Sequence, residues 1–432
     1  MENDSKAKLE EISDKIIHLS NENKMKRRGK ILRKFFKRSN NKIKNKIIKY
    51  EDINSNDKKE ENNQSIKKIR NPGVDLARII AMFIVVITHY IYYGKPSKLF
   101  PKYKRQISFL ECLTDFHNDE FILISGIVGY KTNKYSNLFY LWLQVAFYSV
   151  GIQKYVTEYK KDFHVRYDIE KQYYPLIFSQ YWYFTIYFGT YLFLPLINKG
   201  IEHLTKFELR LVIMSSLGIL ILWRDYKNRN DMFNFHGGGS IPWFLLFYTI
   251  GGYIGKYKVN YNGFKRLILL FLYGSIYLIA SYVYFKACVK KEYNFIIFNK
   301  RIEIPFEMRK MLNESYDSSL KIIQSISVCL FFLHIPYNKY IGKLICFFGP
   351  LAFGIYLIHD NNIIRENYVR KLFIYESRNI SFNSVLNIIL MKALKVSLIC
   401  LLIDYLRHLL FTILRIKKIL IFIETKIKEK FN

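Results

Sequence analysis

The feature that most limits how this chain can fold is a series of ten apolar stretches between residues 76 and 411. A helix of about 20 predominantly apolar residues crosses the hydrocarbon core of a bilayer. The stretches occupy residues 76–94, 107–130, 138–152, 180–198, 207–223, 240–256, 263–286, 320–336, 341–360 and 384–411. The pattern predicts an all-α polytopic integral membrane protein with about ten transmembrane helices. Because half of all residues are hydrophobic and 17% are aromatic, a cytosolic enzyme, a small disulfide scaffold and a collagen-like chain are excluded.

The two ends of the chain are polar and basic. Residues 1–70 are mostly Lys, Asn, Glu and Ser, and this composition predicts a largely disordered tail. Residues 71–411 would form the membrane domain, and residues 412–432 a second basic segment. An even number of spans puts both ends on one side, and the positive-inside rule assigns that side to the cytoplasm. The plasma membrane is the expected location.

The formal net charge of +32 limits the possible partners. The basic residues lie in the tail and in short loops rather than on one face of a recognisable nucleic-acid-binding module. We therefore expect anionic lipids at the basic ends and no nucleic-acid partner. The five cysteines lie far apart, without a CxxC pair or a Cys/His ligand spacing, which predicts neither a disulfide framework nor a metal site.

The first apolar stretch carries three polar groups on one helical face. Arg78 and His89 are eleven residues apart, which is three turns plus roughly 20°, so both side chains project from the same side about 16 Å apart along the axis. Asp75 lies one turn before Arg78. A charged group in the membrane costs a few kcal/mol unless it faces a cavity or a partner. The alternative interpretation is that Arg78 reaches the headgroups and His89 hydrogen-bonds a neighbouring helix.

The second stretch brings several ionisable residues toward the membrane. On one helix, Asp115, Asp119 and Gly126 would share a face, with Glu120 and His117 beside it. The alternative is a helix that begins near Phe121 and leaves the acids in a solvated loop. Ser125 and Gly126 are small enough to let another helix approach closely.

The ninth stretch ends with His359 and Asp360. In the expected orientation, His89, His359, Asp119 and Glu120 lie at a similar depth in the outer half of the membrane. Imidazole and carboxylate groups at one level could move a proton from a hydroxyl. A His359 that only marks the membrane interface is the alternative.

Two other groups of residues have ordinary explanations. Arg407 and His408, near the end of the tenth stretch, are expected at the cytoplasmic headgroups. The Trp and Tyr residues of the fourth and sixth stretches are typical of the aromatic belts at membrane interfaces.

Taken in order, these segments resemble the acyltransferase 3 family of integral-membrane acyltransferases. Its opening motif resembles GVDLARIIAMFIVVITHYIYYG, and its second and third helices resemble FILISGIVGYKTNKYSNLFYLWLQVAFYSV. Further similarity lies in YWYFTIYFGTYLFLPLIN, IPWFLLFYTIGGYIGKY and FGIYLIHDNNIIR. The resemblance covers roughly residues 74–411. It implies an enzyme that moves an acyl group, usually acetyl, from acyl-CoA to a hydroxyl of a surface polysaccharide or lipid-linked glycan.

The resemblance also implies roles for single residues. Arg78 and His89 would be the essential pair, with His89 as general base or acyl carrier and Arg78 near the phosphates of acetyl-CoA, a donor substrate rather than a bound cofactor. The expected substrate-binding or orienting residues are Asp75, Asp119, Glu120, Ser125, His359 and Asp360. A transporter or flippase that uses the same groups as a proton or substrate path is the rival hypothesis.

Overall fold

The computed structural model describes residues 70–160, 169–226, 236–258, 261–286, 294–297, 300–303, 318–373, 376 and 379–431. The chain divides into two compact units, Met1–Ile69 and Arg70–Asn432. The disorder predicted for the N-terminal tail therefore concerns residues outside the described part, and everything below concerns the second unit.

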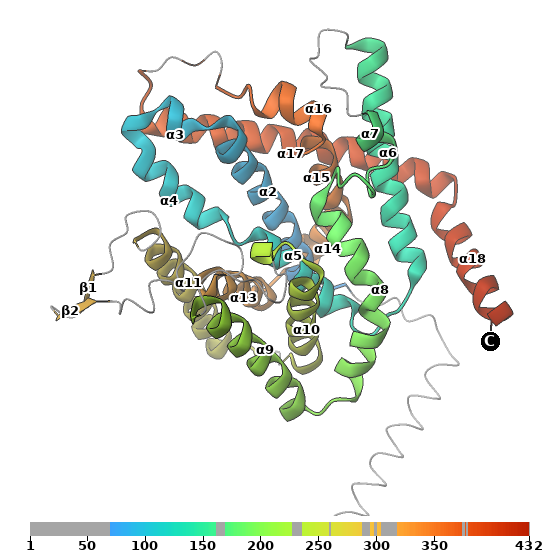
Figure 1. Cartoon of the computed structure of the whole chain (residues 1–432), viewed down its shortest axis with the longest axis horizontal. Helices are drawn as coiled ribbons and strands as arrows, with labels where there is room; N and C mark the ends of the chain where they lie inside the picture. Colours follow the sequence, from blue (N-terminus) through green and yellow to red (C-terminus); the bar gives the residue numbers. More distant parts are fainter. Residues whose placement is uncertain are drawn as a thin grey trace, which may run out of the picture. The chain divides into compact units, whose positions relative to one another are not determined.

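The described part is helical apart from one short antiparallel pair of strands, β1 (Asn294–Ile297) and β2 (Lys300–Glu303) (Figure 1). The helices are α2 (Pro72–Gly94), α3 (Pro96–Leu99), α4 (Lys104–Thr114), α5 (His117–Gly129), α6 (Tyr135–Tyr159), α7 (Ile169–Tyr173), α8 (Trp182–His203), α9 (Lys206–Tyr226), α10 (Ile241–Tyr257), α11 (Phe264–Tyr284), α13 (Ser319–His334), α14 (Lys339–Phe348), α15 (Ala352–His359), α16 (Asn362–Ile364), α17 (Phe382–Ile413) and α18 (Ile416–Phe431). The all-α prediction is confirmed at this level.

Four of the described helical segments are long and apolar enough to cross a membrane: α2, α11, the α14–α15 segment Lys339–His359, and α17. Each predicted stretch coincides with a helix or a pair of helices, while the number of ten spans stays a prediction. A turn at Gly349–Leu351 separates α14 from α15, where Gly349 and Pro350 interrupt the apolar sequence. The chain is thus an integral membrane protein.

The second predicted span is wrong as a single helix. Thr114 ends α4, Asp115 leaves the helical conformation, and His117 begins α5. The break is held by side chains, because Asp115 forms an ion pair with Lys321 and His117 Nδ1 lies 2.9 Å from the carbonyl of Thr114. Asp115 therefore does not share a helical face with Asp119. The solvated-loop alternative is also wrong, since Asp119 and Glu120 are buried in the first turn of α5.

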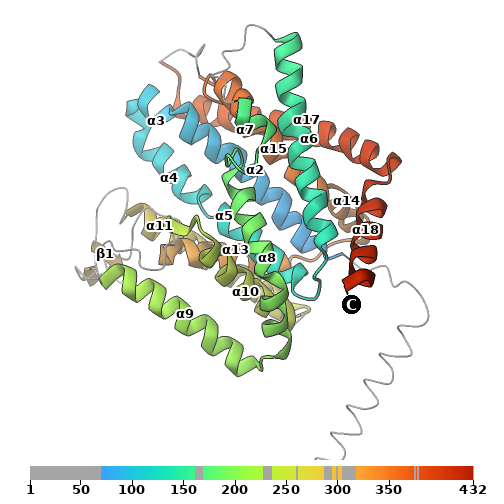
Figure 2. The ribbon, with the colours of Figure 1, turned by 45° about the vertical axis from the view of Figure 1, so that its right-hand side comes forward.

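Helix α2 lies among the other helices rather than at the lipid surface (Figures 1 and 2). It begins at Pro72, which needs no hydrogen-bond partner for its nitrogen, and Asn71 caps it by accepting from the amide of Gly73 at 2.9 Å. Its sides pack against α4, α5, α13, α14, α15 and α17. Polar groups along α2 consequently face protein or an internal cavity.

Helices α5 and α10 approach closely through glycines. A Cβ atom added at Gly126 would lie 2.1 Å from the carbonyl oxygen of Tyr248, and one added at Gly251 would lie 2.2 Å from that of Leu123. Only glycine fits both positions, as expected where helices in a membrane pack backbone to backbone. The predicted close-packing role of Gly126 is confirmed.

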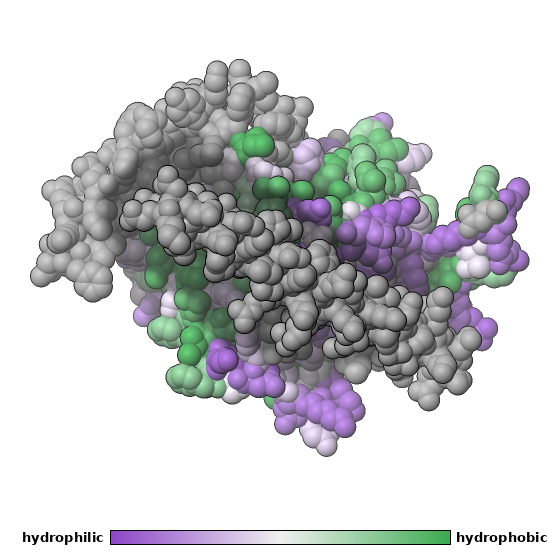
Figure 3. Space-filling view, turned by 90° about the horizontal axis from the view of Figure 1, so that it is seen from below, coloured by the Kyte–Doolittle hydropathy of each residue, from purple (hydrophilic) through white to green (hydrophobic). Residues whose placement is uncertain are grey.

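The face turned toward the viewer in Figure 3 shows groups of hydrophilic residues beside apolar ones among the coloured, described residues.

Candidate active site

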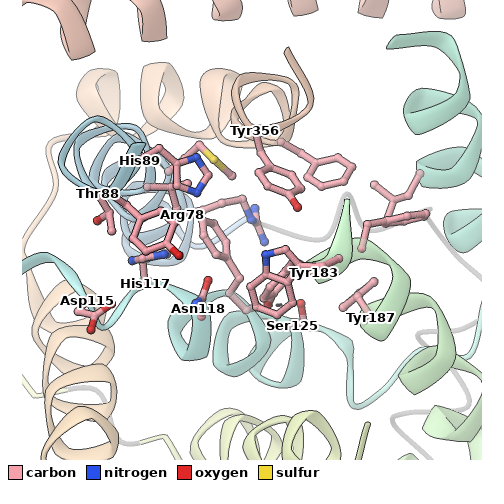
Figure 4. Close-up of a pocket in the computed structure, with 18 of the residues that line it drawn as sticks. Arg78, Thr88, His89, Asp115, His117, Asn118, Ser125, Tyr183, Tyr187 and Tyr356 are labelled. Carbon is pink, nitrogen blue, oxygen red and sulfur yellow. Dashed lines mark hydrogen bonds between the residues drawn. The ribbon is translucent and has the colours of Figure 1, made fainter. Parts of the chain in front are cut away.

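A cavity of about 1340 Å³ lies between the helices. Its wall takes side chains from α2, α4, α5, α6, α8, α15 and α17, several of which point toward a common space in Figure 4. Among the predicted site residues, Arg78, His89 and Ser125 line this cavity. Asp75, Asp119, Glu120, His359 and Asp360 lie behind the wall.

His89 is held by two residues from the end of α15. Its Nδ1 lies 3.0 Å from Nε2 of His359 and 3.4 Å from Oδ1 of Asp360. The His89 side chain keeps 16% of its surface exposed, whereas His359 is 1% exposed. Residues 270 positions apart are thus brought together, with only His89 open to the cavity.

Hydrogen-bond chemistry assigns the protons of this pair. The carbonyl of Ile355, 2.6 Å from His359 Nδ1, can only accept, so that nitrogen carries a hydrogen. In neutral His359, Nε2 is then an acceptor, and His89 must donate to it from Nδ1. The nearby Asp360 carboxylate, also an acceptor, favours the same tautomer. Nε2 of a neutral His89 is therefore left with its lone pair.

Asp360 is fixed in turn by Arg365, which follows α15 in the chain. Nη1 of Arg365 donates to Oδ1 of Asp360 at 3.1 Å, and Nη2 donates to Asn362. The guanidinium also lies 4.9 Å from the ring centre of Tyr93. Sequence reasoning did not single out Arg365; its spacing of five residues from Asp360 was the available signal.

Arg78 lies in a second charged group at the start of α2. Its Nη1 donates to Oδ1 of Asp75 at 2.6 Å, and Asp75 also accepts two hydrogen bonds from Arg70 at 2.7 and 2.9 Å. Asp75 is 2% exposed and does not line the cavity, while both arginines do. The carboxylate is therefore placed to hold the arginines rather than to touch a substrate.

Three buried polar groups on the cavity wall have no hydrogen-bond partner of normal geometry among the described residues. They are Nδ2 of Asn118 and the hydroxyls of Tyr183 and Tyr356. Buried polar groups are ordinarily paired, so an unpaired group at a cavity is available to a ligand. Figure 4 shows their side chains around the space that His89 also faces. Sequence reasoning missed all three residues, since nothing in their local pattern sets them apart from packing residues.

Of the remaining predicted residues, Asp119 and Ser125 hydrogen-bond other groups of the protein, and Glu120 is buried. Oδ1 of Asp119 accepts from the indole of Trp243 at 2.9 Å, so Trp243, 1% exposed, is not a residue of an interface belt. Glu120 is 1% exposed, and its oxygens have no hydrogen-bond partner of normal geometry among the described residues. The hydroxyl of Ser125 donates to the carbonyl of Phe121 at 2.9 Å.

The prediction that Arg407 reaches the headgroups is wrong. Arg407 is 3% exposed and donates to both oxygens of the buried Asp404, at 2.9 and 2.7 Å. Gln144 and Tyr148 of α6 donate to the same carboxylate at 3.0 and 2.8 Å, and Arg407 also donates to the Tyr140 hydroxyl at 3.0 Å. Asp404 on the same helix and Tyr140 of α6 thus turn Arg407 inward.

The carboxylate of Asp404 is also enclosed by backbone. A Cβ atom added at Gly354 would lie 2.3 Å from its carboxyl carbon, so α15 can pass this point only with glycine. Among the described residues, no group of three or more His, Cys, Asp or Glu side chains is placed to hold a metal ion.

Comparison with known proteins agrees with this architecture. The family model described as an acyltransferase domain matches residues 71–403, which include α2 through most of α17. No curated protein and no solved structure matches the chain. Because the match covers most of the chain, including the helices that carry His89, His359 and Asp404, the chain belongs to the acyltransferase 3 family.

Proposed function

We propose that this membrane acyltransferase moves an acyl group, most simply acetyl, from acyl-CoA to a hydroxyl of a cell-surface polysaccharide or lipid-linked glycan. The observation that carries the proposal is the His89–His359–Asp360 arrangement, which leaves Nε2 of His89 as a proton acceptor at the cavity wall. A general base must lie where an acceptor hydroxyl can reach it.

The size and charge of the cavity support two substrates. Its volume of about 1340 Å³ exceeds the roughly 300–1,000 Å³ usual for one small ligand. Among the basic residues on its wall, Arg70 and Arg78 lie near the start of α2, His408 near the end of α17 and Lys417 near the start of α18. These helix ends are the ones expected at the cytoplasm, so the phosphates of a CoA thioester fit there, with planar Arg78 as a two-pronged contact.

One base can carry out the proton transfers between the two substrates. Nε2 of His89 takes the proton of the acceptor hydroxyl as its oxygen attacks the thioester carbonyl carbon. When the carbon–sulfur bond breaks, the proton passes from His89 to the thiolate, giving an ester and free CoA. His359 and Asp360 keep the proton on Nδ1 of His89 throughout.

The negative charge that develops on the carbonyl oxygen also needs hydrogen-bond donors. Nδ2 of Asn118 and the hydroxyls of Tyr183 and Tyr356 meet this need, because each lies at the cavity wall without a hydrogen bond of normal geometry to a described residue. The same groups could alternatively hold the acceptor sugar, and the two roles differ in whether kcat or KM changes on substitution.

Mass spectrometry of cell-surface glycans tests the proposal. Cells with the gene should show a mass increment of one acyl group that cells without it, or with His89→Ala, lack. His203→Ala provides a matched control, because His203 is exposed at the end of α8, away from the cavity wall. Equal glycans in wild type and His89→Ala would exclude His89 as the base.

The proposed arrangement in the plasma membrane has ten spans, with both termini cytoplasmic. Lys98 lies beyond the end of α2, and Asn262 lies between α10 and α11; both are exposed. In a background without native cysteines, an impermeant thiol reagent outside the cell should label Lys98→Cys and spare Asn262→Cys until the membrane is opened. The opposite labelling pattern would reverse the orientation.

A further inference from the structure

The C-terminal helix α18 is fixed to the start of α6. Arg415, with φ of 53°, turns the chain after α17, and α18 packs against α6. Ile416, Leu420 and Glu424 are its partly buried residues, four apart on one helical side. This side is therefore the one that meets the protein.

Glu424 makes the attachment specific. Its carboxylate accepts hydrogen bonds from the backbone amides of Tyr135 and Ser136, at 3.2 and 3.0 Å. These amides belong to the first turn of α6, where they lack partners within the helix and where the helix dipole favours a negative charge. Although burial alone would raise it, the hydrogen bonds from Lys428 and Ser136 lower the pKa of Glu424 to about 2. The attachment therefore holds at neutral pH.

Apolar side chains of α18 next to this attachment are about half exposed. Ile419, Phe422, Ile423 and Ile427 are 49%, 63%, 47% and 53% exposed. At 100° per residue Phe422, Ile419 and Ile423 form one arc that ends beside Ile416, and Ile427 lies between Ile416 and Leu420. The ammonium groups of Lys426 and Lys430 extend from the same arc in the last turns of the helix. Ile413, at the end of α17, is also 76% exposed. Exposed apolar surface of this kind is typical of a membrane contact.

The charges of α18 fit anionic headgroups. The helix carries five lysines and two glutamates. Two of the lysines pair within the helix, Lys426 with Glu429 and Lys428 with Glu424, each at 2.8 Å. Lys417, Lys418 and Lys430 have no ion pair among the described residues. A helix with an apolar arc and unpaired lysines lies at a bilayer surface and prefers anionic lipid.

We propose that α18 binds the headgroup layer of an anionic bilayer and thereby holds Lys417 at the basic end of the cavity. Lys417 lines the cavity together with His408, and it lies in the first turn of the helix that Glu424 fixes. Lipid binding at α18 does not depend on the proposed reaction, and its test needs no activity measurement.

The test places an environment-sensitive fluorophore on either side of α18 in the full chain. Phe422→Cys and the control Thr425→Cys are made in a background lacking native cysteines, labelled, and reconstituted in nanodiscs with or without phosphatidylglycerol. The label at position 422 should emit at shorter wavelength than that at position 425. It should be quenched by spin-labelled lipid, more strongly when phosphatidylglycerol is present. Lys418→Glu combined with Lys430→Glu should remove the dependence on anionic lipid.

Other outcomes overturn the proposal. Equal emission and equal lipid quenching at positions 422 and 425 would show that the apolar arc does not enter the bilayer. A blue shift at position 422 without lipid quenching, together with disulfide cross-linking between two Phe422→Cys chains, would show that a second copy covers the arc instead.

Discussion

Two groups of buried charged or ionisable residues border the same cavity, and they differ in how their hydrogen bonds are used. Around Asp404, both carboxylate oxygens accept, and Arg407, Gln144 and Tyr148 all donate to them. Around His89, one ring nitrogen is bound by His359, and the other has no hydrogen bond to a described residue.

This difference in hydrogen bonding assigns a structural role to the group around Asp404 and a chemical role to His89. The carboxylate of Asp404, whose two oxygens both accept hydrogen bonds from the protein, joins α17 to α6. A histidine with one nitrogen fixed and one open can take a proton in a defined direction. Burial and charge alone, which the two groups share, would not have separated them.

The largest expected effect is on catalysis at His89. His89→Ala should lower the rate of transfer by about 10²- to 10⁴-fold, the usual contribution of a general base. The released CoA thiol, measured with a chromogenic thiol reagent, reports the rate. The thermal unfolding midpoint in detergent should change little, because the removed ring faces the cavity. A large drop in this midpoint with normal residual activity would assign His89 to the structural class.

Asp404 should show the opposite pattern. Asp404→Ala leaves Arg407 buried without its partner, and breaking a buried pair in this way costs about 3–5 kcal/mol of stability. The midpoint of unfolding in a denaturant titration should therefore move to a much lower denaturant concentration. Replacing both residues, as Asp404→Leu with Arg407→Met, should recover much of this loss. Full stability of Asp404→Ala alone would show that the network does not hold α17 to α6.

The sequence predicted the cavity-facing residues Arg78 and His89 better than it predicted the Asp404–Arg407 pair. Arg78 and His89 are singled out by their spacing on one helical face, and His359 by its expected depth. Asp404 and Arg407 sit at the end of an apolar stretch, where an arginine ordinarily reaches the headgroups. Arg407 turns inward through Asp404, three residues earlier on the same helix, and through Tyr140 of α6, and no local pattern encodes the contact with α6.

The fold, like the site, was predictable only in part. The lengths of the apolar stretches showed where the helices lie, because a helix that crosses a bilayer needs about 20 apolar residues. The break between α4 and α5 was not predicted, since it depends on Lys321 of a distant helix pairing with Asp115. The unpaired Asn118 and Tyr183 were missed for the same reason: whether a polar group has a partner is decided by tertiary structure.

Arg78, in the separate charged group at the start of α2, tests the acyl-CoA side of the cavity. Hydrogen bonds to charged groups contribute about 1.5–3 kcal/mol, so loss of the planar guanidinium should raise the KM for acetyl-CoA by about 10- to 150-fold. Arg78→Lys keeps the charge but not the two-pronged geometry and should be nearly as damaging as Arg78→Ala. Unchanged donor affinity in Arg78→Ala, measured by calorimetry, would remove Arg78 from the donor site.

The smallest expected effects come from replacing Tyr by Phe at two positions, one on the cavity wall and one beside Asp404. Tyr183→Phe removes a hydroxyl that has no partner among the described residues, so stability should be unchanged while transfer falls several-fold, by the roughly 1 kcal/mol of one hydrogen bond to substrate. Tyr148→Phe removes a hydroxyl that donates to Asp404 at 2.8 Å, so stability should fall by about 1.5–3 kcal/mol while kcat and KM of the folded fraction stay near wild type. Thermal unfolding and steady-state kinetics are both measured on both variants, so that stability and transfer can be compared for each. If both substitutions act on stability, or both on transfer, the two groups do not divide structure from chemistry as their hydrogen bonds indicate.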